Sequence, residues 1–200
     1  MGVFDTIRQV LGLSAETDAT RSADPEDLFG MSTAYLTMEA DLGFRPTGDA
    51  ALCFGNVDSS GFRDARAEVE AVLELGEEET GTAASFIEDS HGYSWVVLSD
   101  SDFENLVTSV HFASDTLIEE GFGSRLLAAL FAFEREETTA YWVYSFRRGA
   151  YYPFVPVGGH EREGTVEFKL ESNLDGELEI EDDTSYWYPI WPEGDAHPWG

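Results

Sequence analysis

The hydrophobic positions between Ser101 and Pro156 change from the spacing of a helix to the spacing of strands. The first part predicts an amphipathic helix that opens with a capping box from Ser101 to Glu104 and stops at Gly121 and Gly123. Its inward face consists of residues three or four positions apart, namely Phe103, Leu106, Val107, Val110, Ala113, Leu117 and Ile118.

Three apolar runs follow this helix, at residues 126–133, 139–146 and 150–157. The second run is the clearest strand of the chain, because aromatic and β-branched residues dominate it. The first run fits either a strand or a helix, since its Leu and Ala residues favour a helix. Two prolines in the third run place Tyr151–Pro156 at a sheet edge or beyond the sheet.

The rest of the chain carries shorter patterns. An Asp24-Pro25 start predicts a helix to Leu42, with a break near Gly30–Ser32. The further expected elements are a strand at 50–57, a helix at 61–75, an acidic loop at 76–81, strands at 83–89 and 93–98 joined by a turn at 90–92, and a short strand or helix start at 165–170.

These elements predict an α+β fold in one domain, with a mainly antiparallel sheet and helices packed on one face. The helix from Ser101 to Glu120 is expected at its centre. The expected organisation is an amphipathic N-terminal segment at 1–13, a linker at 14–24, the α+β domain at 25–170, and an acidic, then Trp- and Pro-rich C-terminal extension at 171–200. The aromatic residues of this extension are expected to pack on the domain.

The N-terminal segment places Phe4, Ile7 and Leu11 on one helical face. A helix of thirteen residues is marginal alone in water, so the segment needs a surface to lie on. It either docks on its own domain, with partial disorder as a variant, or serves as a contact for a membrane surface or a partner protein. Arg8 is its only basic residue, so any membrane contact would be hydrophobic.

Charge narrows the classes of function. The chain has 40 Asp and Glu against 11 Lys and Arg, a net charge of −29 and 14% aromatic residues. The acids are spread over the whole length, a pattern typical of a salt-adapted protein whose self-repulsion is screened at high salt. The aromatic content argues against a disordered acidic chain, and the lack of a basic stripe excludes nucleic-acid binding of the usual kind. Without a secretory signal or an apolar run of about 18 residues, the chain is expected to be cytoplasmic, with peripheral contact at the inner membrane face as an extension.

Residues for catalysis or metal binding are sparse. Cys53 is the only cysteine and lies in an apolar run, which predicts a buried, inert thiol. His111 stands in the predicted central helix without a neighbouring ligand, and His91 lies in a turn beside Glu88 and Asp89. We therefore expect no catalytic residue, cofactor or metal, and an enzyme or metal protein is the third-ranked alternative.

One local departure from the acidic composition is the adjacent pair Arg147 and Arg148, followed closely by Tyr151 and Tyr152. Two interpretations stay open. Either the arginines of a hairpin turn pair with nearby acids, or these residues form a contact patch for a protein or an anionic group, since Arg and Tyr are enriched at interface centres.

An ordered set of segments resembles one protein family. The segments are residues 1–5, 46–48 and 52–54, then Glu88 to Leu98, Asp102 to His111, 121–127 and 143–154. They are similar to the phage-shock-protein-A-associated family PspAB, in its halophilic archaeal type. The resemblance covers most of residues 1–157 and becomes weaker beyond them.

This resemblance implies a non-enzymatic accessory or adaptor role in envelope stress, beside a PspA-type membrane-remodelling protein or an HtpX-type membrane protease. It supplies no catalytic residues. The order of elements is also loosely similar to small secretion-chaperone or YbjN-type α+β domains. That second likeness implies a protein-binding module that holds an extended client strand at an open sheet edge near Tyr151–Val157.

Overall fold

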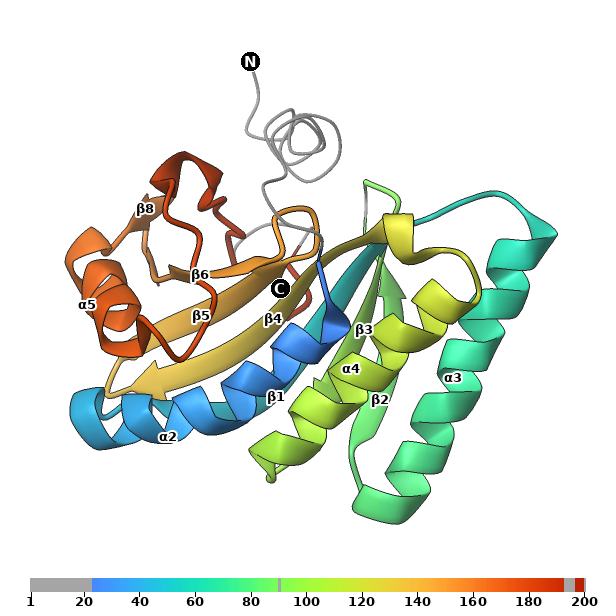
Figure 1. Cartoon of the computed structure of the whole chain (residues 1–200), viewed down its shortest axis with the longest axis horizontal. Helices are drawn as coiled ribbons and strands as arrows, with labels where there is room; N and C mark the ends of the chain where they lie inside the picture. Colours follow the sequence, from blue (N-terminus) through green and yellow to red (C-terminus); the bar gives the residue numbers. More distant parts are fainter. Residues whose placement is uncertain (1–22, 90, 193–196, 200) are drawn as a thin grey trace.

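A six-stranded antiparallel sheet forms the frame of the protein (Figure 1). The computed structural model describes residues 23–89, 91–192 and 197–199. Its strand order is β2-β3-β1-β4-β5-β6, with a separate small ladder of β7 and β8. The N-terminal segment 1–13, with Phe4, Ile7 and Leu11, and most of the expected linker lie outside the described residues.

The helical elements alternate with groups of strands along the chain. They are η1 (Pro25–Gly30), α2 (Met31–Leu42), α3 (Ser60–Thr80), α4 (Phe103–Glu119), η2 (Gly123–Arg125), α5 (Gly164–Leu174) and η3 (Thr184–Tyr186). The strands are β1 (Arg45–Gly55), β2 (Ala83–Glu88), β3 (Tyr93–Ser99), β4 (Leu126–Arg135), β5 (Thr138–Ser145), β6 (Ala150–Phe154), β7 (Pro156–Val157) and β8 (Glu161–Arg162).

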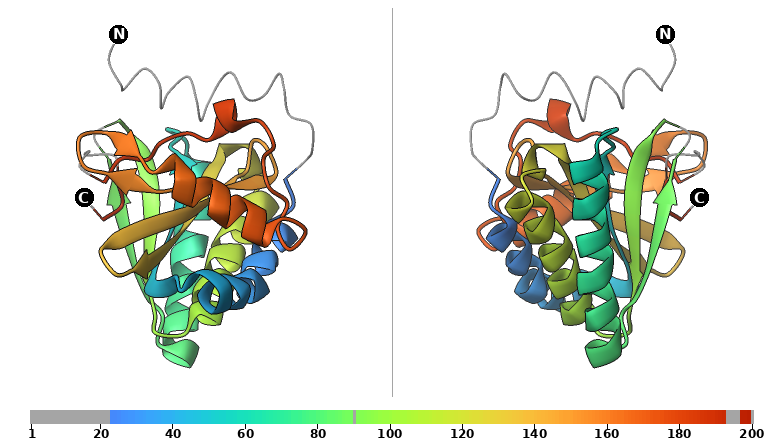
Figure 2. Two further views of the ribbon diagram at one scale, coloured as in Figure 1. Left: turned by 90° about the vertical axis from the view of Figure 1, so that its left-hand side faces the viewer. Right: turned by 90° about the vertical axis from the view of Figure 1, so that its right-hand side faces the viewer.

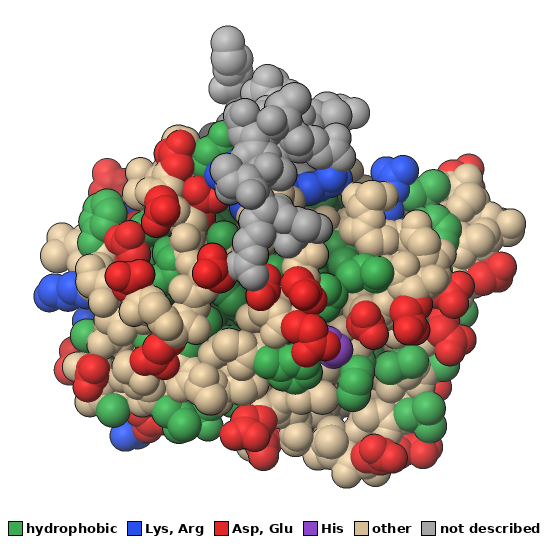
Figure 3. Space-filling view, in the orientation of Figure 1, with side chains coloured by type: hydrophobic (Ala, Val, Ile, Leu, Met, Phe, Trp, Pro, Cys, Tyr) green, Lys and Arg blue, Asp and Glu red, His purple; other side chains and the backbone are tan. Residues whose placement is uncertain are grey.

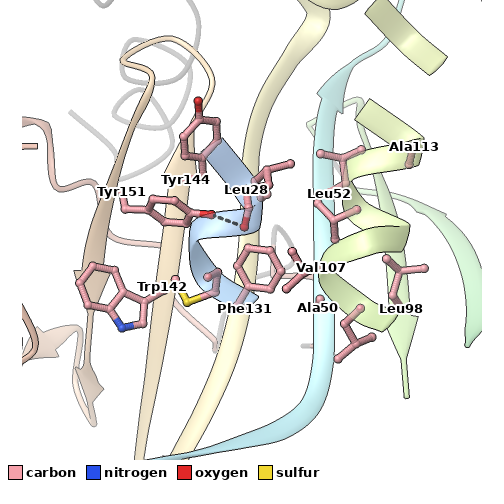
Figure 4. Packing of buried hydrophobic residues seen from close by; sticks show 14 of the residues in the cluster. Leu28, Ala50, Leu52, Leu98, Val107, Ala113, Phe131, Trp142, Tyr144 and Tyr151 are labelled. Carbon is pink, nitrogen blue, oxygen red and sulfur yellow. Dashed lines mark hydrogen bonds between the residues drawn. The ribbon is translucent and has the colours of Figure 1, made fainter. Parts of the chain in front are cut away.

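One face of the sheet is covered by helices (Figures 1 and 2). Because side chains alternate along a strand, Leu52 of β1 points to the helices while Cys53 points to the other face. On the helical side, Leu28, Val107 and Phe131 are fully buried together (Figure 4). The Tyr151 hydroxyl donates a hydrogen bond of 3.2 Å to the Leu28 carbonyl, which ties β6 to η1. The single α+β domain with helices on one face is thus confirmed.

The chain after α5 returns along the opposite face of the sheet. Trp187 and Ile190 are buried there, against a second cluster that includes Trp95 and Phe154. Leu174 and Leu178, by contrast, belong to the core under the helices. Residues beyond 170 therefore contribute to both faces, and the aromatic residues of the C-terminal segment pack on the domain as expected.

The start of the central helix differs from the prediction. The N-cap is Asp102, whose carboxylate accepts the Glu104 N–H at 3.0 Å, and Ser101 lies one residue outside the helix. Asp100 accepts the Asp102 N–H at 2.8 Å and so fixes the chain before the cap. The expected inward face is buried except for Ile118, which is 39% exposed at the last turn.

The structure decides four further points that the sequence pattern had left open or had predicted wrongly. Residues 126–133 form part of β4, because a strand between β1 and β5 is buried on both faces and does not alternate in polarity. Residues 165–170 lie in α5. The expected loop at 76–81 is wrong, since α3 continues to Thr80 and ends at Gly81 with a φ of 86°. The break at Gly30 is confirmed as the junction of η1 and α2.

Candidate functional site

The turn between β5 and β6 does not present the expected Arg and Tyr contact patch. Arg148, Tyr151 and Tyr152 are 6%, 0% and 1% exposed. Arg148 Nε donates to Glu181 Oε2 at 2.6 Å, and its guanidinium lies 3.8 Å from the centre of the Tyr186 ring. The patch is wrong for these three residues, because the C-terminal segment covers Arg148 and Tyr152, while the Tyr151 side chain is buried under η1. The other interpretation, in which an arginine of the turn pairs with an acid, holds for Arg148.

Arg147, the neighbour of that buried arginine, stays half-buried and donates to the Ser124 carbonyl at 3.0 Å. Burial raises the pKa of Tyr151 and the pKa of Tyr152. The two tyrosines are therefore neutral packing residues in the described fold. The turn itself is held to η2 by Arg147 and to the C-terminal segment by Arg148.

The sheet edge at Tyr151–Val157 is closed by the chain itself. The Tyr151 N–H donates to the Glu179 carbonyl at 2.7 Å, and the Glu181 N–H donates to the Tyr151 carbonyl at 2.8 Å. Further along, the Val155 N–H donates to the buried Glu167 carboxylate at 2.8 Å. The expectation of an open edge at this position is therefore wrong, since residues 179–181 take the place of an added strand.

The opposite edge, β2, is open. In the described part of the chain its backbone pairs with β3 alone, and no further backbone hydrogen bond reaches it. Its side chains alternate between exposed and half-buried, and Ile87 is 38% exposed. The right-hand view of Figure 2 shows this strand at the flank of the sheet beside α3.

A groove of about 280 Å³ runs between this edge and α3. The helix contributes three carboxylates to the groove, and the strand contributes small and aromatic side chains. The lining residues are Glu70, Leu73, Glu74, Glu77, Ala84, Ser85 and Phe86. The arrangement combines free backbone hydrogen-bonding groups with fixed negative charge, which suits an extended, basic polypeptide segment.

A second hollow, of about 570 Å³, lies where α2, the start of β1 and the start of α4 meet. Its charged side chains Glu39, Arg45 and Asp100 have polar partners in the fold. Arg45 forms an ion pair of 3.1 Å with Glu39, and Asp100 accepts hydrogen bonds from the Thr82 hydroxyl and from Asn105 Nδ2. These contacts fix the approach of the chain into β1 and α4.

The two histidines singled out from the sequence differ in their surroundings. His111 is 8% exposed, its ring centre lies 4.5 Å from that of Phe29, and its Nε2 lies 3.3 Å from Glu26 Oε1. Figure 3 shows a histidine at the surface among hydrophobic and acidic side chains. His91 is exposed, and its backbone N–H donates to Asp89 Oδ1. The described residues include no group of three or more His, Cys, Asp or Glu that could hold a metal ion.

Cys53 is 1% exposed, and burial raises its pKa well above the ordinary value, with the charge of Asp89 adding to the shift. The expected buried thiol is confirmed, and a neutral thiol in this position is a poor nucleophile. Within the same described ranges, no helix combines the length and the hydropathy needed to cross a bilayer.

Comparison with known proteins adds one result. A family model described as PspAB, PspA associated protein B, matches residues 1–199. The match includes the C-terminal segment that closes the β6 edge, a region where the sequence resemblance had become weak. Neither the curated proteins nor the solved structures gave a match to this chain.

Proposed function

The chain belongs to the PspAB family of PspA associated proteins, and we propose that it is a non-enzymatic accessory protein that binds a PspA-type membrane-remodelling protein in an envelope-stress response. In this role it works on the cytoplasmic side of the membrane. An HtpX-type membrane protease is the second partner that such a system implies.

The family match over residues 1–199 is the observation that carries the proposal, because the family is named for its association with PspA. Two features of the described surface support a binding role. Phe29 and Phe112, whose rings both contact the His111 ring, are 36% and 50% exposed, and β2 leaves one edge of the described sheet without a partner strand. Exposed aromatic rings and free strand edges are surfaces that protein partners commonly cover.

Co-purification tests the proposal. The tagged full chain, expressed in its own organism, is expected to recover the PspA-type protein after cross-linking and purification at the salt concentration of the cell. A tagged, unrelated acidic protein of similar net charge serves as the control for charge-driven recovery. Failure to recover a PspA-type protein above this control would contradict the proposed function.

The same co-purification experiment tests the N-terminal segment, residues 1–13. A variant without residues 1–13 is expected to recover less PspA-type or HtpX-type protein, because the spacing of Phe4, Ile7 and Leu11 predicts an apolar face for partner contact. Recovery equal to that of the full chain, at matched salt, would remove these residues from the proposed contact and leave the folded domain as the binding part.

A further inference from the structure

The two edges of the sheet are treated differently by the chain. At β6, residues 179–181 supply backbone partners and thereby close the edge. At β2, the six residues Ala83–Glu88 include neither a lysine nor a proline, and the described chain places nothing over their outer backbone groups. Such an edge promotes strand addition unless charge, proline or a covering segment protects it.

The helical side of this edge carries negative charge. Glu70, Glu74 and Glu77 line the groove from α3, above Ala84 and Phe86 of the strand. Arg66 is the basic residue near them; it pairs with Glu70 at 3.4 Å and lies 5.5 Å from the centre of the Phe86 ring. Glu74 and Glu77 are exposed. A strand added here would direct alternate side chains towards these two carboxylates.

The other side of the same edge is apolar. Ile87 is 38% exposed and stands opposite Trp95 in the β2–β3 ladder, while Ser85 stands opposite the half-buried Val97. The remaining side chains of an added strand would extend this surface, since neighbouring residues on one face of a sheet pack together. An added strand therefore needs basic side chains on the α3 side and apolar side chains on the other side, at alternate positions.

We propose that the β2 edge binds an extended segment of a partner protein in which basic residues alternate with apolar ones, as a seventh strand of the sheet. The inference rests on the proposed function in taking the segment from the partner of the chain. A second copy of this chain is the wrong occupant on grounds of charge, because pairing of two β2 edges would bring together two rows of α3 carboxylates on chains of net charge −29.

The test uses the full chain and two synthetic peptides of about ten residues. One peptide alternates Arg and Val, and the other contains the same residues as a block of Arg followed by a block of Val. The alternating peptide is expected to bind and to slow amide hydrogen exchange in Ala83–Glu88, while the block peptide binds weakly and leaves that exchange unchanged. Equal binding of both peptides would overturn the inference, because it would show charge attraction without strand pairing.

Paired variants locate the binding. Ile87→Lys is expected to abolish binding of the alternating peptide, because an exposed lysine protects a strand edge, whereas Leu36→Lys, at another exposed position, preserves it. Glu74→Gln/Glu77→Gln is expected to weaken binding about threefold to tenfold at about 0.1 M salt. Glu78→Gln/Glu79→Gln removes the same charge from the same helix outside the groove and should have little effect. Equal losses from the two double variants would count against the site.

Co-purification separates this inference from the proposed function. If the wild-type chain recovers a PspA-type protein and Ile87→Lys recovers as much, the partner binds elsewhere and the β2 proposal fails while the proposed function stands. If the wild-type chain recovers none but binds the alternating peptide at β2, the proposed function fails and the edge remains a binding site for a different protein.

Discussion

Arg148 and Glu181 form an ion pair with an Nε–Oε2 distance of 2.6 Å although the two residues lie 33 positions apart and their side chains are only 5% and 8% exposed. The pair joins the β5–β6 turn to the segment that closes the β6 edge. The hydrogen bond to Glu181 raises the pKa of Arg148 against the opposing effect of burial. The Tyr186 ring covers the guanidinium at 3.8 Å.

Breaking this pair should destabilise the fold strongly. Arg148→Met leaves the Glu181 carboxylate in a buried position without its partner, which costs about 3 kcal/mol or more of the free energy of unfolding. Denaturant unfolding at matched salt measures the loss. Arg148→Met/Glu181→Leu should be more stable than the single variant, because no unpaired charge remains. A single variant as stable as the wild type would show that the pair is solvated.

Alanine substitutions at two glycines near the end of α3 should change the stability of the protein in opposite directions. Gly76 lies inside the helix with no atom within 4 Å of an added Cβ, so Gly76→Ala should stabilise the protein by about 0.5–1 kcal/mol. Gly81 ends the helix with a φ of 86°, so Gly81→Ala should destabilise it by about 1 kcal/mol. Thermal unfolding of both variants checks the pair, and a loss of stability in Gly76→Ala would restore the loop expected from the sequence.

Gly48 makes a close backbone contact that another residue cannot reproduce. Its φ is 91°, and an added Cβ would lie 2.9 Å from the Asp100 carbonyl oxygen. The Asp100 N–H in turn donates to the Gly48 carbonyl at 3.0 Å, so the two strands cannot easily separate. Gly48→Ala should therefore cost about 2–3 kcal/mol in unfolding free energy. A cost equal to that of Gly81→Ala would show that the backbone moves to admit the side chain.

The sequence predicted the fold well where the pattern alone carries the information. The inward face of α4 and the strands around Trp142 follow from periodicity and from aromatic content. It failed where a distant contact decides. Leu126–Arg135 reads as helix or strand until its two neighbouring strands are known. The helical Glu77–Glu79 stretch was misread for a local reason, because Gly76 before it suggested a loop.

The binding surface was less predictable for the same reason. The Arg147–Tyr152 patch was inferred from local charge, but Glu181 and Tyr186, far along the chain, fold over Arg148. The open edge at β2 depends on strand order, which the sequence did not supply. Local composition offered one indication of it, the absence of Pro from Ala83–Glu88 between acidic stretches.

Stability should depend on the protonation of His197. Its side chain is buried beside the stacked rings of Tyr141 and Trp199, and its Nδ1 accepts the backbone N–H of Trp199 at 3.3 Å. Burial lowers the pKa of His197 from 6.5 to about 4. Above about pH 6.5 the imidazole is neutral in the folded and in the unfolded protein, so its full contribution to the free energy of unfolding is present. Between about pH 6.5 and 4 the unfolded chain binds a proton that the folded chain refuses, and stability falls.

His197→Phe removes this proton-linked loss. The difference in unfolding free energy between the wild type and the variant should shift in favour of the variant by about 3 kcal/mol from pH 7 to pH 4. Taking the difference at each pH cancels the titration of the many carboxylates, which both proteins share. Denaturant unfolding across this range measures the shift. Parallel pH profiles, or an imidazole resonance of His197 that titrates near 6.5 in the folded protein, would show that the ring is open to water.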